Sequence, residues 1–148
     1  MNSSRISMSE IYPIITEMLE TDGKVTIKVS GWSMQPMVYH LRDTVTLIKP
    51  PKKLKKYDLP FYRTSDGRFI MHRIIKVHKD GTYTCQGDNL WEKEFPVMQD
   101  QIFAVVDSFC RNGKNISVNK SISYWLYTRT WWFFHHFKKY YKYIKIRK

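Results

Sequence analysis

The chain has 148 residues, 43% of them hydrophobic and 16% aromatic, which suits one folded domain and excludes a disordered chain. Its net charge of +12 is unevenly placed. Residues 1–107 hold 15 basic and 13 acidic side chains, whereas residues 108–148 hold 10 basic and no acidic ones. No run of 18 apolar residues is present, and two cysteines exclude a disulfide framework. A segment of single charge sign usually meets a polyanion, such as lipid headgroups or nucleic acid.

The first predicted elements are a helix and a strand that leads to a serine. The helix is expected over Ser9–Glu20, with Ser9 as its cap, because apolar residues recur there at helical spacing. A strand over Val25–Ser30 follows and is broken by Gly31, and Ser33 stands directly after the break. A serine at the end of a strand bent by glycine is well placed to be a nucleophile, although such a serine also occurs in ordinary loops.

Further short strands and turns fill the chain up to residue 107. The predicted strands are Arg42–Ile48, Leu59–Arg63, Arg68–Val77, Thr82–Gln86 and Gln101–Val106. Turns are expected at Ser65–Gly67, Lys79–Gly81, Gly87–Asn89 and Arg111–Lys114, and a basic loop over Lys49–Lys56. This pattern predicts a mostly β fold: a small, coiled antiparallel β-domain with an N-terminal helix over residues 1–107, then a turn and a basic, aromatic helical tail over residues 108–148.

Two later residues could assist the serine. His72 projects from the middle of the Arg68–Val77 run among apolar neighbours, and imidazole is the usual base for a serine because its pKa lies near neutrality. Asp88 could accept the other imidazole N–H and orient the ring. Both residue types are also common in purely structural positions, and Glu92 and Glu94 are alternative carboxylates.

Three motifs occur in order: SGWSMQP around Ser33, RFIMHRIIKV around His72 and QGDN around Asp88. Together they resemble the type I signal peptidase and SOS-repressor autoprotease superfamily, and most closely its Ser/His branch, similar to the endoplasmic-reticulum and archaeal signal peptidases. The resemblance spans roughly Gly23–Val106. It implies that Ser33 is the nucleophile, His72 the general base and Asp88 the residue that orients His72.

The chain also departs from the family pattern. Bacterial signal peptidases and the autoproteases use a lysine base where this chain has His72, and Gly31 stands where signal peptidases place a helper serine. The oxyanion donors are therefore expected to be backbone N–H groups, including that of Ser33. In the endoplasmic-reticulum enzymes the carboxylate lies several residues after G-D-N, so the third catalytic position stays open among Asp88, Glu92 and Glu94.

The resemblance implies a peptide or preprotein substrate, bound as an extended leader-like strand by main-chain pairing. Ile27, Val29 and Met34 are the expected lining of its side-chain pockets, or alternatively plain core residues. No cofactor or metal is expected. The predicted function is a serine endopeptidase. The alternative is a non-catalytic module that keeps the fold and binds a membrane surface or nucleic acid.

The tail, Tyr124–Lys148, holds eleven aromatic residues between Tyr124 and Tyr143. Aromatic belts and lysines suit an anionic membrane surface; packing on the domain is the alternative, and nucleic-acid binding is less favoured. Acidic residues near the N-terminus argue against a signal peptide, and two reduced cysteines favour the cytoplasm, so the expected location is peripheral on the inner face of the cell membrane. The expected membrane-contact residues are Trp125, Trp131, Trp132, Lys138, Lys142 and Lys145.

Overall fold

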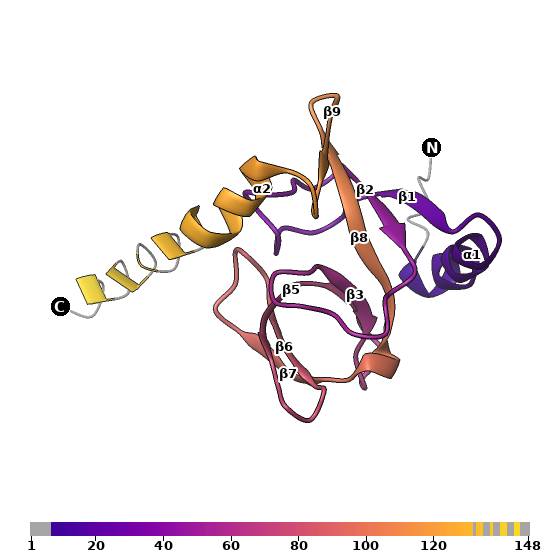
Figure 1. Cartoon of the computed structure of the whole chain (residues 1–148), viewed down its shortest axis with the longest axis horizontal. Coiled ribbons are helices and arrows are strands. Elements are labelled where there is room, and N and C mark those ends of the chain that lie inside the picture. The colour runs from indigo at the N-terminus through magenta and orange to yellow at the C-terminus, as the bar shows by residue number, and fades with distance from the viewer. Residues whose placement is uncertain (1–6, 132, 135–136, 138–139, 142–143, 146–148) are drawn as a thin grey trace.

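The computed structural model describes residues 7–131, 133–134, 137, 140–141 and 144–145. Its fold is mostly β and antiparallel, with an N-terminal helix and a short C-terminal helix, which confirms the predicted fold class. The strands form the body of the molecule, helix α1 lies at one side of it, and the C-terminal helical segment projects from the opposite side (Figure 1).

Helix α1 spans Met8–Thr21 and begins with a capping box. The Ser7 backbone N–H donates to the Glu10 carboxylate at 2.7 Å, and the Glu10 N–H donates to the Ser7 hydroxyl at 3.4 Å. The predicted cap, Ser9, is wrong, because a capping box needs a glutamate three residues after the cap and only Ser7 has one. The apolar face of the helix is confirmed, since Ile15 and Leu19 are buried in the main core.

The larger sheet contains six strands: β1 (Lys24–Lys28), β2 (Thr44–Ile48), β3 (Pro60–Arg63), β4 (Phe69–Met71), β8 (Ile102–Arg111) and β9 (Lys114–Ser117). Their order is β1-β2-β8-β3-β4, with β9 paired to β8, and every pair is antiparallel. Strands β1 and β4 end this order, so within the described residues each has one edge without a strand partner.

The smaller sheet has the order β5-β6-β7, formed by Arg73–Val77, Tyr83–Gln86 and Lys93–Val97. It packs against the larger sheet through a second buried cluster that includes Tyr62, Ile74 and Cys85. Cys85 and Cys110 are both free thiols.

The predicted single strand over Arg68–Val77 is wrong, because the structure divides it at His72. Met71 pairs with Phe61 in the larger sheet, whereas Arg73 pairs with Gln86 in the smaller one. The chain thus passes from one sheet to the other at His72, and the expected alternation of faces breaks there: His72, Arg73 and Ile74 are consecutive and all buried.

Two strands were not predicted. β7 contains Pro96, which weakens a strand pattern, and β9 follows the predicted turn after Arg111. A 3₁₀ turn, η1 (Gln99–Gln101), precedes β8. Strand β8 itself runs through residue 107, where the sequence suggested that the β-domain ends and the tail begins.

The tail starts with α2 (Ile122–Leu126) and the π-helical turn η2 (Tyr127–Trp131), and it is helical at each described position beyond residue 132. Within the described residues, no helix has the length and apolar character needed to cross a membrane.

Candidate active site

Ser33 lies in a turn that follows β1. Gly31 has φ +112°, a conformation that favours glycine, and its N–H donates to His40 Nδ1 at 2.9 Å. The indole of Trp32 stacks on the same His40 ring, with 4.9 Å between centroids. The predicted break at Gly31 is therefore confirmed, and it directs Ser33 into a cleft.

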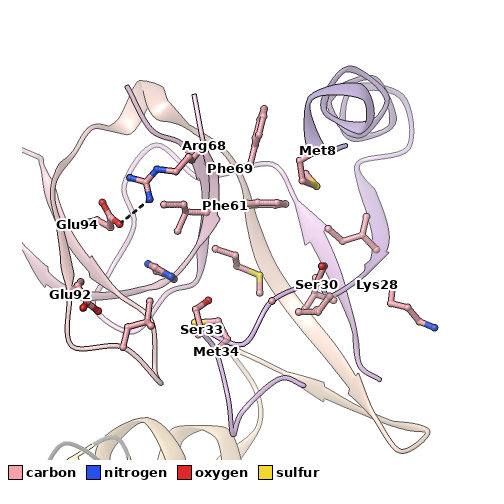
Figure 2. A pocket seen from close by; sticks show the side chains of 18 residues that line it. Met8, Lys28, Ser30, Ser33, Met34, Phe61, Arg68, Phe69, Glu92 and Glu94 are labelled. Atoms are coloured by element: carbon pink, nitrogen blue, oxygen red, sulfur yellow. Dashed lines mark ion pairs between the residues drawn. The ribbon is translucent and has the colours of Figure 1, made fainter. Parts of the chain in front are cut away.

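This cleft has a volume of about 460 Å³ and lies between β1 with its following turn and β4. Both Ser33 and His72 line it. Arg68, Glu92 and Glu94 lie together on one side, and Lys28 points away from the cleft on the other (Figure 2). The apolar residues of the lining are Met8, Ile27, Val29, Met34, Val45, Phe61, Phe69, Ile70, Met71 and Leu90.

The His72 imidazole is almost fully enclosed, at 5% exposure. Its Nδ1 is buried and has no hydrogen-bond partner among the described residues. Burial lowers the pKa of His72 to about 4; the charge of Asp88 opposes this shift, and that of Arg68 adds to it. The ring is therefore neutral at neutral pH and can accept a proton.

The serine turn and the imidazole meet at Gly87. A β-carbon placed on Gly87 would lie 2.8 Å from the backbone oxygen of Ser33 and 3.1 Å from His72 Nε2. The structure thus brings together two predicted site residues that are far apart in sequence. Among the described residues, neither the Oγ nor the backbone N–H of Ser33 has a hydrogen-bond partner. No hydrogen bond joins Ser33 Oγ to His72, and catalytic hydrogen bonds commonly form only when substrate binds.

Asp88 does not make the expected hydrogen bond to His72. Its carboxylate accepts from Arg73 Nε at 2.8 Å and from Arg73 Nη2 at 2.7 Å, and it also accepts from the Tyr127 hydroxyl at 2.8 Å. Both Arg73 and Asp88 are buried, at 0% and 1% exposure, and a buried guanidinium requires a paired anion. Neither Glu92 nor Glu94 replaces Asp88 at His72 Nδ1, although both line the cleft.

The Gly87–Asn89 turn has another role, which sequence reasoning missed. The Asn89 backbone N–H donates to the Ser33 carbonyl at 2.8 Å, and its side-chain amide donates to the Trp32 carbonyl at 3.3 Å. This turn therefore holds the serine turn in place. The G-D-N motif indicated a turn, but no local signal in the sequence indicated which segment it contacts.

The three predicted substrate-binding residues, Ile27, Val29 and Met34, all line the cleft. Val29 and Met34 are also buried in the main core, and Ile27 packs against it. The interpretation as pocket residues and the interpretation as core residues are thus compatible, because side chains of the main core also line the cleft. Sequence reasoning missed the lining from Phe61, Phe69 and Met71.

The expected membrane-contact residues are only partly described. Trp125 is 53% exposed, with the Arg129 guanidinium 4.3 Å from its ring, and Lys145 is exposed. Trp131 belongs to η2, and Trp132, Lys138 and Lys142 lie outside the described residues. The aromatic residues described farther along the tail are all exposed: Phe133, Phe134, Phe137, Tyr140 and Tyr141.

No protein-family model, curated protein or solved structure matches the chain. The resemblance to signal peptidases stays a prediction from the three sequence motifs.

Proposed function

We propose that the chain is a serine endopeptidase that cuts an extended leader or signal-like peptide. Ser33 Oγ attacks the peptide carbonyl, while His72 Nε2 takes the hydroxyl proton and passes it to the leaving amine. Water, activated by the same imidazole, then releases the acyl group from Ser33. The proposal rests on one observation. The position that a β-carbon on Gly87 would take lies 2.8 Å from the Ser33 backbone oxygen and 3.1 Å from His72 Nε2, so the serine turn and the imidazole are neighbours.

The environment of His72 affects a role as the base in two ways. Burial keeps the imidazole neutral at neutral pH, which leaves a nitrogen lone pair for the serine proton, but by lowering the pKa to about 4 it also makes the ring a weaker base than an exposed histidine. With Nδ1 unpaired among the described residues, packing rather than a carboxylate orients the ring. The proposed catalytic unit is therefore a Ser33–His72 dyad. Asp88 does not bond to His72 but accepts hydrogen bonds from Arg73, the next residue in the chain.

The proposed oxyanion donor is the backbone N–H of Ser33, which has no acceptor among the described residues. A fixed N–H that faces the developing negative charge stabilises the tetrahedral intermediate. This donor takes the part that a helper serine plays in signal peptidases, where this chain has Gly31.

The sheet order supports an extended peptide as substrate. The cleft is bordered by β1 and β4, the strands at the two ends of the β1-β2-β8-β3-β4 order, and each has a single strand partner among the described residues. An unpaired edge offers N–H and C=O groups to an incoming strand, so a peptide can pair there while alternate side chains enter the apolar cleft. Ile27, Val29 and Met34 are the proposed pocket residues.

An anionic membrane surface is the proposed partner of the tail, on the cytoplasmic side. The described aromatic residues beyond η2 are exposed; Phe137, for example, is 64% exposed. This exposure favours an external partner over packing of the whole tail on the domain. Aromatic residues and lysines together suit the interface between headgroups and acyl chains.

The test is labelling by a fluorophosphonate probe, followed by mapping of the labelled residue. We expect the probe to modify Ser33, with no labelling of Ser33→Ala and labelling of His72→Gln slower by about 10²–10⁴-fold. Ser30→Ala is the matched control, because Ser30 lines the same cleft and has no assigned role. Thermal unfolding of each variant checks that it is folded.

Absence of label on Ser33, or equal labelling of the native protein and His72→Gln, refutes the dyad. The non-catalytic binding module is then the better interpretation.

A further inference from the structure

The Arg73–Asp88 pair is a buried junction between three parts of the chain. Besides its two bonds to Asp88, Arg73 places Nη2 3.0 Å from the sulfur of Met37, in the segment that carries Ser33. Arg73 also donates from Nη1 to the Tyr124 hydroxyl at 2.6 Å. The pair therefore links the serine segment, the Gly87–Asn89 turn and the start of the tail.

The tail is attached to the body at this junction. We call residues 122–131 (α2 and η2) the tail root. The Tyr127 hydroxyl donates to Asp88 at 2.8 Å, and the rings of Tyr124 and Tyr127 lie 5.5 and 5.6 Å from the Arg73 guanidinium. Burial, together with the charge of Asp88, raises the pKa of Tyr127, so its phenol stays protonated and remains a donor.

From Asp88 the path to the proposed nucleophile is short. The next residue, Asn89, donates its N–H to the Ser33 carbonyl at 2.8 Å, and a β-carbon on the preceding residue, Gly87, would touch both Ser33 and His72. On the other side of the pair, Arg73 directly follows His72 in the chain. A shift of the Arg73–Asp88 pair therefore acts on both members of the dyad.

We infer that Tyr127 is a positioning residue for Ser33: by holding Asp88 it fixes the turn that holds the serine, so the attachment of the tail root sets the reactivity of the cleft. This inference rests on the proposed function. It assigns a role at the site to the C-terminal segment, which none of the three sequence motifs includes.

The test compares two tyrosine variants in the full chain. Tyr127→Phe removes the hydroxyl that bonds Asp88 and keeps the ring. Tyr83→Phe is the control, because its hydroxyl donates to Gln99 at 2.7 Å and accepts from the Leu54 N–H at 3.1 Å, and neither partner belongs to the Arg73–Asp88 pair. Two quantities are measured for each: the rate of fluorophosphonate labelling of Ser33, and the hydrogen-exchange rate of the Asn89 amide.

We expect Tyr127→Phe to speed exchange at Asn89 and to slow labelling, each by about 3–10-fold, the size of one lost hydrogen bond. Exchange at His78, whose N–H bonds Thr82, should stay unchanged in both variants. Tyr83→Phe should change neither Asn89 exchange nor labelling.

Unchanged exchange at Asn89 in Tyr127→Phe overturns the inference, as does faster exchange without slower labelling, or equal effects in Tyr83→Phe. Failure of the proposed function gives a different result. The native protein then goes unlabelled, while exchange at Asn89 still decides whether Tyr127 fixes the turn.

Discussion

Replacing Gly87 with alanine tests the geometry of the cleft most directly. Gly87 does not have positive φ, unlike the other glycines of the chain, so alanine is not strained by the backbone. The added β-carbon would lie 2.8 Å from the Ser33 carbonyl oxygen, 3.0 Å from a methyl of Leu90 and 3.1 Å from His72 Nε2. The Leu90 methyl can rotate away, but the other two contacts cannot relax so easily.

The size of the effect follows from these distances. Ordinary contact of a β-carbon begins at 3.4 Å, so the Ser33 oxygen must retreat by about 0.6 Å and the imidazole by about 0.3 Å. Overpacking of this kind destabilises by about 1–3 kcal/mol. For a domain of this length, that lowers the melting temperature by about 2–12 °C. Because sub-ångström misplacement of reacting groups slows reactions, we expect Ser33 labelling to fall at least about tenfold.

Differential scanning calorimetry and fluorophosphonate labelling measure the two effects. Gly81→Ala is the control: Gly81 has φ +84° and no atom within 4 Å of its β-carbon position, so alanine there strains the backbone away from the cleft. It should lower stability without slowing labelling. If Gly87→Ala melts and labels like the native protein, Ser33 and His72 do not meet at Gly87.

Three further predictions concern the buried pair, the imidazole and the tail. Asp88→Asn leaves the Arg73 charge unpaired and should lower the free energy of unfolding in urea by about 3–5 kcal/mol. The pKa of His72 is lowered from 6.5, the ordinary value, to about 4 in the folded protein. The contribution of the neutral imidazole to the free energy of unfolding is therefore complete above pH 6.5 and is lost as the pH falls through 4. That loss amounts to about 3 kcal/mol, and His72→Gln should remove it. Replacing the tail lysines Lys138, Lys142 and Lys145 with glutamine should weaken co-sedimentation with vesicles containing phosphatidylglycerol by about 100-fold, since each basic group contributes about 1 kcal/mol.

Each of these predictions has a matched comparison. Asp66→Asn breaks an exposed ion pair with Arg68 and should leave unfolding nearly unchanged, so an equal loss there contradicts the account of Asp88. An NMR titration midpoint of His72 near 6.5 contradicts burial as the cause of its shift. Glutamine at Lys52, Lys53 and Lys55 removes the same charge from the basic loop and should preserve vesicle binding; equal weakening contradicts the role of the tail.

Local signals in the sequence predicted the position of Ser33 and the fold class. Gly31 marked the break after β1, and alternating residues with turn signals marked most strands, because these features depend on neighbouring residues alone. The division of Arg68–Val77 at His72 could not be predicted in this way. Both halves alternate as one strand would, and only pairing with distant partners separates them.

The predicted hydrogen bond from His72 to Asp88 is absent for a related reason. The sequence shows a carboxylate near a histidine in motif order, but it does not show that Arg73 points inward. Arginine is rarely fully buried, and its partners here lie 15 and 51 residues away, at Asp88 and Tyr124. The tail root reaches the site through that buried arginine and its partner Asp88, so its proposed contribution to the site could not be predicted from the sequence either.

The edge of β1 that has no strand partner in the described part of the chain has a consequence for the behaviour of the protein at high concentration. Open strand edges promote self-association, and lysines on an edge oppose it. Lys24 and Lys28 are exposed on β1, so two copies that pair through this strand bring like charges together. Salt screens such repulsion over about 8 Å at physiological ionic strength, and it equally weakens attraction between the basic tail and anionic lipid. Rising salt should therefore favour aggregates while it releases the protein from membranes, a combination that light scattering and vesicle sedimentation can separate.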